Sequence, residues 1–241
     1  MKRMIIIVLS LVLVASLLSG CMAVRPVDVV VGKGEPVAYE YTVGNYEKIR
    51  IEGYADVRYY SSPSDVVTLE IQPNLRDHCV VEVVGNELVF RMKRTISTNR
   101  APVLTVSTPV LTSMASYGAG YFTAYDEIIA DSFSLTVSGA GGGRAELSVK
   151  DLSVVISGAG GFDLSGKADT ANIIMSGAGA LNALSLETRE TSVIMSGAGT
   201  VKVNCTERLK IDGSGVGTVE YKGSPSVDLV KSGVITVRHA G

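Results

Sequence analysis

Hydrophobic residues alternate with polar or small residues through most of the second half of the chain. Two successive stretches show apolar or small residues on every second position: Leu152, Val154, Ile156, Gly158, Gly160, Phe162 and Leu164, then Ala171, Ile173, Met175, Gly177, Gly179, Leu181 and Ala183. A period of two residues is typical of a β-strand, in which successive side chains point to opposite faces. Because the alternation keeps its phase through the glycines, it predicts strands that run through them with one face buried.

The same segment repeats the tetrapeptide Ser-Gly-Ala-Gly. Copies or variants begin at positions 117, 138, 157, 176, 196, 214 and 232, so the steps between them are 18 to 21 residues. The apolar columns coincide from copy to copy, and no copy has the 3.6-residue period of a crossover helix. The repeat therefore predicts an all-β fold, a parallel β-helix (β-solenoid) whose coils of 18–21 residues stack in register.

Two further details of this solenoid follow from general rules. Right-handed crossovers dominate among parallel strands, and the chain lacks the six-residue period of hexapeptide solenoids, so we expect a right-handed, roughly three-sided β-helix. The glycines are expected where a coil turns sharply, or where opposite walls come too close for a Cβ atom.

Upstream of the repeats the pattern is less regular. The segment "IRIEGYADVRYY" (49–60) alternates like a degenerate early coil, and the 65 residues between Glu52 and Tyr117 leave room for three coils or for an excursion. Within them, "VVEVVGNELVFRMKR" (80–94) carries Gly85-Asn86 between two apolar runs, which predicts a hairpin.

The expected domain organisation follows from these patterns. A tether over 21–45 precedes one β-helix domain over 46–241, which divides into degenerate coils with a hairpin (46–116) and the Ser-Gly-Ala-Gly repeats (117–241).

The first residues have the pattern of an export signal. Lys2 and Arg3 precede an apolar run that ends in Leu18-Ser19-Gly20-Cys21, which resembles a bacterial lipobox. Residues 1–20 are therefore predicted to be a lipoprotein signal peptide and Cys21 the lipidated residue, which would anchor the chain to a membrane. The residues after Cys21 show neither a retention Asp nor an acidic export run. The expected location is the outer membrane, facing the periplasm by default, with surface exposure left open.

Charge and cysteine content narrow the function classes. The formal net charge is −2, with no basic run after the first residues, so the chain lacks the electrostatic pattern of nucleic-acid binding. Cys79 and Cys205 could pair in an oxidising envelope, but we expect two buried free thiols, because Cys205 falls on an inward position of the repeat.

The glycine motif does not match a cofactor or metal site. A dinucleotide fingerprint needs a third glycine where this chain has Arg144 or Asp163. A calcium-binding solenoid needs a carboxylate in every coil, whereas the column of Asp163 contains mainly other residue types: Thr123, Arg144, Asn182, Lys202 and Glu220. No catalytic constellation stands out, so we expect no cofactor, no metal and no enzyme activity. A polysaccharide-active enzyme is the weaker alternative.

One outward column is a candidate interaction face. By strict alternation Val155, Ile174 and Ile194 point outward in three consecutive coils, beside a ladder formed by Ser157, Ser176 and Ser196. Three stacked apolar residues next to small ones suggest a covered face. The cover would be residues 72–108 folding back or a second copy of the chain, which would make a homo-oligomer. Solvated surface is the alternative.

Several segments together resemble one family. The lipobox, "IRIEGYADVRYY", "PVLTVSTPVLTSM" (102–114), the iterated Ser-Gly-Ala-Gly and "YKGSPSVDLVKSG" (221–233) are similar to the head GIN domain family, also described as auto-transporter adhesins and as a domain of unknown function. The resemblance covers about residues 40–241. It implies a right-handed β-helix in a secreted or lipid-anchored envelope protein, and it supplies no catalytic residues.

The expected function is therefore a lipid-anchored, non-catalytic, adhesin-like binding module of the cell envelope. Its ligand would be a glycan, a protein or a lipid. The alternative is a structural envelope protein that self-associates. The chain has 4 Phe and no Trp, and its tyrosines cluster before the glycine repeats, which weakens the case for a glycan.

Overall fold

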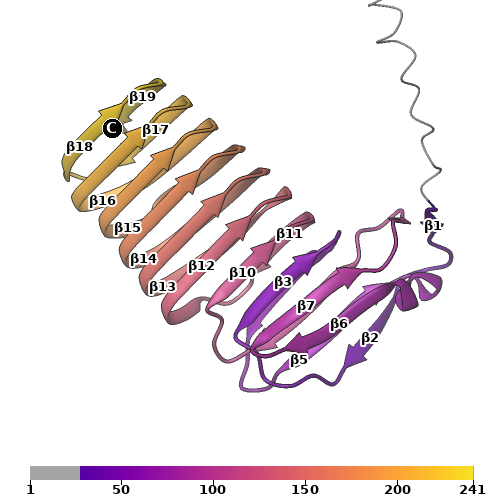
Figure 1. The fold of residues 1–241 in the computed structure, drawn as a ribbon. Helices are drawn as coiled ribbons and strands as arrows, with labels where there is room; N and C mark the ends of the chain where they lie inside the picture. The colour runs from indigo at the N-terminus through magenta and orange to yellow at the C-terminus, as the bar shows by residue number, and fades with distance from the viewer. Residues whose placement is uncertain (1–27, 241) are drawn as a thin grey trace, which may run out of the picture.

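The computed structural model describes residues 28–240, and most of them form β-strands. Seventeen strands belong to one continuous sheet, which winds into a β-solenoid of about seven turns. Figure 1 shows the coils stacked side by side along one axis, with the irregular N-terminal strands at one end and β18 and β19 at the other. The expected all-β solenoid is confirmed.

The repeats build regular parallel coils. Each of β13 to β16 is one long bent strand that covers nearly a whole coil and is interrupted only at Ser-Gly. The strands of this region are β10 (Ser113–Ser116), β11 (Ala119–Ala124), β12 (Ile128–Val137), β13 (Ala140–Ile156), β14 (Ala159–Met175), β15 (Ala178–Met195), β16 (Ala198–Gly213), β17 (Val216–Lys222), β18 (Ser226–Lys231) and β19 (Val234–His239).

Equivalent residues stack in register from coil to coil, as the repeat predicted. Val154 pairs with Ile173, and Ile173 pairs with Val193. All three side chains are buried, and the glycines between the apolar positions keep the inward phase. Burial of one such side chain contributes about 1.5–3 kcal/mol, but only when the neighbouring coils are in place to cover it.

The alternation changes phase at a charged corner. Lys150 and Asp151 are both exposed although they are adjacent, and Arg189 and Glu190 repeat the feature two coils later. Together with the Ser-Gly corner, this break separates two outer surfaces. We call residues 152–156 and their equivalents in other coils wall A, and residues 159–165 and their equivalents wall B.

The degenerate early coil is confirmed. β3 (Lys48–Glu52) and β4 (Asp56–Ser61) pair in parallel with β10 and β11, so that Ile49 lies beside Met114 and Val57 beside Phe122. The residues between them form an excursion that returns to the stack. Its strands β7 and β9 add one more parallel layer on the other side of β3 and β4.

Antiparallel strands close this end of the solenoid. The predicted hairpin is present as β6 and β7, joined at Gly85, whose φ of 64° lies in the left-handed region that favours glycine. β5 pairs antiparallel with both β2 and β9. The remaining elements are β1 (Val30–Val31), β2 (Val37–Tyr41), β5 (Val66–Ile71), the 3₁₀ helix η1 (Pro73–His78), β6 (Cys79–Val84), β7 (Glu87–Met92), β8 (Ile96–Ser97) and β9 (Val103–Thr108).

These strands bear on one predicted boundary and on the state of the two cysteines. The tether expected over residues 21–45 ends earlier than position 45, because β2 already belongs to the main sheet. The signal peptide (1–20) and Cys21 lie outside the described residues. Cys79 and Cys205 are buried free thiols, one in each part of the molecule.

Candidate functional site

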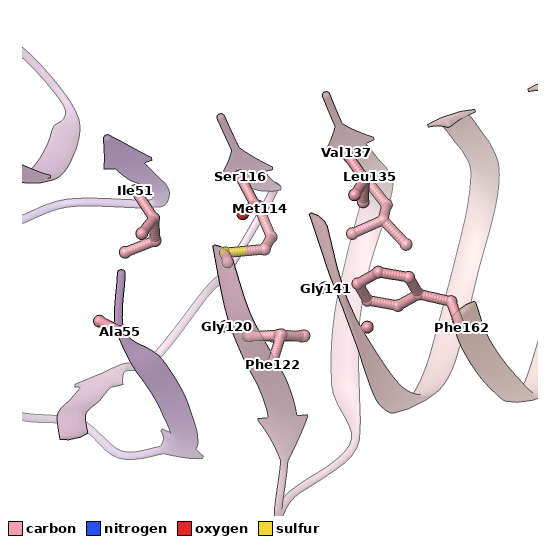
Figure 2. Close-up of a pocket in the computed structure, with 11 residues that line it drawn as sticks. Ile51, Ala55, Met114, Ser116, Gly120, Phe122, Leu135, Val137, Gly141 and Phe162 are labelled. Atoms are coloured by element: carbon pink, nitrogen blue, oxygen red, sulfur yellow. The ribbon is translucent and has the colours of Figure 1, made fainter. Parts of the chain in front are cut away.

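The interior between the first coils is too tightly packed to hold a ligand. Figure 2 shows apolar side chains from successive coils, including Ile51, Met114, Phe122, Leu135 and Phe162, around one small enclosed cavity. Its volume is about 10 Å³, and a single water molecule needs about 10–15 Å³. In this part of the core the apolar residues serve packing, so candidate surfaces are sought on the outer walls.

The glycines bring the backbones of successive coils close together. A Cβ atom on Gly177 would lie 2.0 Å from the carbonyl oxygen of Gly158, and one on Gly197 would lie 2.1 Å from that of Gly177. The expected reason, a sharp turn or close opposite walls, is therefore corrected. The obstacle is the carbonyl oxygen of the preceding coil, which also accepts a hydrogen bond from the next N–H: Ala178 N donates to Gly158 O over 3.1 Å.

The predicted apolar column exists on wall A. Val155 pairs with Ile174, and Ile174 pairs with Ile194, so the three side chains stack in adjacent coils. Ile174 and Ile194 are 40% and 45% exposed, which shows that residues 72–108 do not cover them. Polar residues end the column on both sides, with Thr136 beside Val155 and Asp212 beside Ile194. We call these three residues the apolar stripe.

The serine ladder lies next to the stripe, at the corner between the two walls. Ser157, Ser176 and Ser196 are all exposed. Their spacing is fixed by the backbone, because Ser176 N donates to Ile156 O over 3.0 Å and the same bond recurs at each Ser-Gly corner. The structure thus places all six predicted surface residues side by side on three consecutive coils.

A second group of exposed side chains, which the repeat pattern did not predict, lies on the outer side of wall B. Tyr60, Tyr121 and Tyr125 are 37%, 46% and 51% exposed. The rings of Tyr60 and Tyr125 are stacked, with centroids 5.0 Å apart and an interplanar angle of 3°. The Tyr121 ring leans over Gly142 of the next coil, where one ring carbon is 3.2 Å from the position a Cβ would occupy. We call these three residues the tyrosine cluster.

A polar groove runs across the next coils of wall B. It is a hollow of about 390 Å³ that begins at Ala124, the neighbour of Tyr125, and crosses β13, β14 and β15. Its polar side chains are Arg144, Glu146, Asp163, Ser165, Asn182 and Ser185. Asn182 Nδ2 donates to Asp163 Oδ1 over 2.9 Å, which fixes two of these groups relative to each other.

Comparison with known proteins agrees with this architecture. The family model described as "Putative auto-transporter adhesin, head GIN domain" matches residues 45–225. The chain belongs to the head GIN domain family. No curated protein is matched by the chain.

Solved structures show the same fold as this head GIN domain. A protein described as a putative adhesin from Bacteroides fragilis is 23% identical with a TM-score of 0.82, and the match covers 88% of this chain and 100% of that one. A putative lipid binding protein from Parabacteroides distasonis (20% identity, 89% and 100% coverage) and a putative adhesin from Parabacteroides merdae (19%, 89% and 100%) both have TM-scores of 0.71. At these identities the likeness concerns the fold alone.

The charged side chains of this head GIN domain mainly join neighbouring coils. A hydrogen bond from Arg189 holds the pKa of the Glu207 carboxyl below its usual range, with 2.8 Å between Nε and Oε1. Lys150 does the same for the pKa of Asp131 over 2.7 Å. Both carboxyl groups therefore stay ionised, and their ion pairs join one coil to the next.

The column of Asp163 has the mixed composition that the sequence analysis described. Arg144, Asp163, Asn182 and Lys202 follow one another in register across four coils. Within residues 28–240, no three His, Cys, Asp or Glu side chains gather closely enough to hold a metal ion. Over the same residues, no helix has the length and apolar character needed to cross a membrane.

Proposed function

We propose that this chain is a lipid-anchored, non-catalytic, adhesin-like binding module of the cell envelope. The observation that carries the proposal is the pair of outer walls on one rigid solenoid. Wall A presents the apolar stripe and wall B presents the tyrosine cluster with its polar groove. Exposed aromatic and apolar side chains on a rigid framework are typical of binding surfaces, because little conformational entropy is lost when a partner binds.

The anchor in this proposal rests on the lipobox. Acylated Cys21 would hold the solenoid at the outer membrane, and a solenoid attached by one end can present its walls to partners. Family membership supports an envelope location in general terms.

The ligand would not be an acyl chain held inside the solenoid. One structural relative is described as a lipid binding protein, but the enclosed cavity between the first coils here measures only about 10 Å³. Lipid-binding pockets need far more room, since small-molecule sites occupy about 300–1,000 Å³. The outer walls are therefore the surfaces to test.

Self-association is the second candidate function, and the apolar stripe favours it. Two of its residues are at least 40% exposed, and they lie beside small residues that allow close approach. A stable interface buries about 1,200–2,000 Å² in total, so a dimer would need much more of wall A than these three side chains.

Two measurements test the proposed function. The full chain and its Cys21→Ser variant are expressed with an alkyne-bearing palmitate; we expect label and membrane attachment only in the wild type, and equal labelling of both would contradict the anchor. Phosphatidylethanolamine–phosphatidylglycerol vesicles that carry the full chain are then applied to surfaces coated with mucin, collagen or intact bacterial cells. Retention above an albumin-coated surface is expected, and retention on none of them would overturn the binding function.

A further inference from the structure

The tyrosine cluster contains one half-exposed ring that is stacked on one side. β11 lies between β4 and β13 in the sheet, and Tyr60 belongs to β4. Tyr60 stacks on Tyr125 from the β4 side, at a centroid distance of 5.0 Å. Because the rings are parallel, the opposite face of Tyr125 is directed toward β13, and half of the residue remains exposed.

The polar groove begins at the residue before Tyr125. Ala124 lines the groove and immediately precedes Tyr125, while Arg144 lies in the next coil, paired with Thr123. Tyr121 lies on β11, and Tyr125 directly follows the last residue of that strand. Arg144 lies between these two aromatic positions in the neighbouring coil.

A β-bulge shapes the floor of the groove. Between β14 and β15 the register shifts, so that Asp163 pairs with Asn182 but Ser165 pairs with Ser185. One extra residue in β15 bends the wall at this point, and bulges of this kind re-aim side chains next to binding sites. The shift occurs within the groove and leaves Ser165 and Ser185 on its lining.

This combination of groups matches the chemistry of a sugar. A pyranose ring has an apolar C–H face that packs on an aromatic ring, and its hydroxyl groups are both donors and acceptors. Carboxylate, amide and hydroxyl side chains pair with neighbouring hydroxyls, and the hydrogen bond between Asn182 and Asp163 holds two of them in place. The hollow of about 390 Å³ lies in the size range of small-molecule sites.

The charge of the groove selects among sugars. Arg144 contributes one positive charge, and Glu146 and Asp163 contribute two negative ones, so the formal sum of its lining is −1. A sulfated or sialylated chain would be repelled by this sum. We propose, resting on the binding function proposed above, that wall B binds a neutral oligosaccharide, with one sugar stacked on Tyr125 and the next units in the groove over Arg144, Asp163 and Asn182.

The test uses a glycan array and the full chain purified in detergent. The array carries neutral, sialylated and sulfated oligosaccharides. We expect the wild type to retain neutral glycans, and Tyr125→Ala and Asp163→Ala each to weaken the affinity for the retained glycan at least tenfold. Because the chain has no Trp, tyrosine fluorescence in solution confirms the binding independently.

The control is a tyrosine of equal exposure outside the groove. Tyr117 is 53% exposed and occupies the Ser-Gly corner of the same coil, so Tyr117→Ala should bind as the wild type does. Retention of no glycan, retention of charged glycans only, or equal affinity of Tyr125→Ala and wild type would each overturn the proposal.

The vesicle experiment separates this inference from the proposed function. Surfaces that retain the vesicles are oxidised with periodate, which destroys vicinal diols of sugars. Loss of retention supports the oligosaccharide site. If retention survives periodate and the array retains no glycan, the oligosaccharide site is overturned but the binding function stands. If the vesicles adhere to no surface, the binding function itself is overturned.

Discussion

The repeat region (117–240) and the N-terminal region (28–116) belong to one sheet but differ in strand pairing and in the size of their buried side chains. In the repeats every coil pairs in parallel with its neighbours, and the inward positions hold small or medium side chains such as Ala171, Val193 and Cys205. The glycine columns let successive coils approach to backbone contact. Stability in such a stack comes from contacts between neighbouring coils, and the same interface recurs at each step.

The N-terminal region uses larger side chains and antiparallel pairs. Tyr46, Tyr59 and Phe90 are fully buried there, and burial raises the pKa of both tyrosines. Their hydroxyls are satisfied individually, since Tyr46 donates to Ser107 O over 3.0 Å and Tyr59 donates to Thr108 O over 3.3 Å. A repeat can extend a stack but supplies no means of ending it, whereas an irregular region with large buried side chains can cover the coil at the N-terminal end of the stack.

The largest expected effect on stability comes from a substitution in the N-terminal region. Phe90→Ala should cost about 3–5 kcal/mol of unfolding free energy, because Phe90 is fully buried and a cavity would remain. Each region contains one buried free thiol, so labelling of Cys79 and Cys205 reports their opening separately. We expect Phe90→Ala to accelerate the labelling of Cys79 much more than that of Cys205.

The pKa of the Cys79 thiol sets the pH at which the labelling is done. Burial raises the pKa of Cys79 to about 11 from an ordinary value of 9.0, so the folded thiol is protonated at pH 8 and reacts after opening. The stability that this group contributes is full below pH 9 and is lost as the pH rises toward 11. Val84→Ala, on an exposed position of the same hairpin, is the control. Equal acceleration at both cysteines would show that the two regions open as one unit.

A smaller effect is expected from the glycine columns of the repeats. Gly177→Ala should cost about 1–3 kcal/mol, because its Cβ would lie 2.0 Å from a backbone oxygen and the coils would have to separate. Gly161→Ala is the matched control, since its nearest neighbour would lie at 3.8 Å. Thermal melting of the two variants should differ by several degrees, about 2–4 °C for each kcal/mol. Equal melting temperatures would remove the steric explanation of the repeat.

The smallest effect on stability concerns the apolar stripe. The triple variant Val155→Lys, Ile174→Lys, Ile194→Lys should dissociate an oligomer, if wall A joins two copies, or destabilise the monomer. The stacked like charges alone cost about 0.2–1 kcal/mol per adjacent pair. Light scattering gives the oligomeric state, and melting gives the stability.

A second triple variant isolates the charge effect. Ser153, Asn172 and Ser192 occupy the neighbouring outward column in the same three coils, and their replacement by Lys adds the same charge without removing an apolar side chain. A change in mass only with the stripe variant supports a covered face. Wild-type mass and melting temperature in the stripe variant would mean that the stripe is solvated surface.

Local pattern alone determined much of this protein. The period of two residues predicted the inward and outward positions, and the recurrence of Ser-Gly-Ala-Gly predicted that Val155, Ile174 and Ile194 share one outward column. Both predictions hold because each coil repeats the one before it at a nearly constant offset. Residues that are neighbours in space are then separated by a distance that can be read directly from the chain.

Only the tertiary structure decided the contacts that bridge an insertion. Tyr60 and Tyr125 stack although they lie 65 positions apart in the sequence. Only the coils of β4 and β11 have this offset among residues 28–240, because residues 62–112 form the excursion between them. Nothing in the sequence showed which coil would lie beside Tyr121 and Tyr125. The pairing of β2 with β5 likewise could not be read from the repeat. An antiparallel pairing across an irregular loop has no repeat to set its register, so burial of one face of β5, with Val67, Leu69 and Ile71, sets it instead.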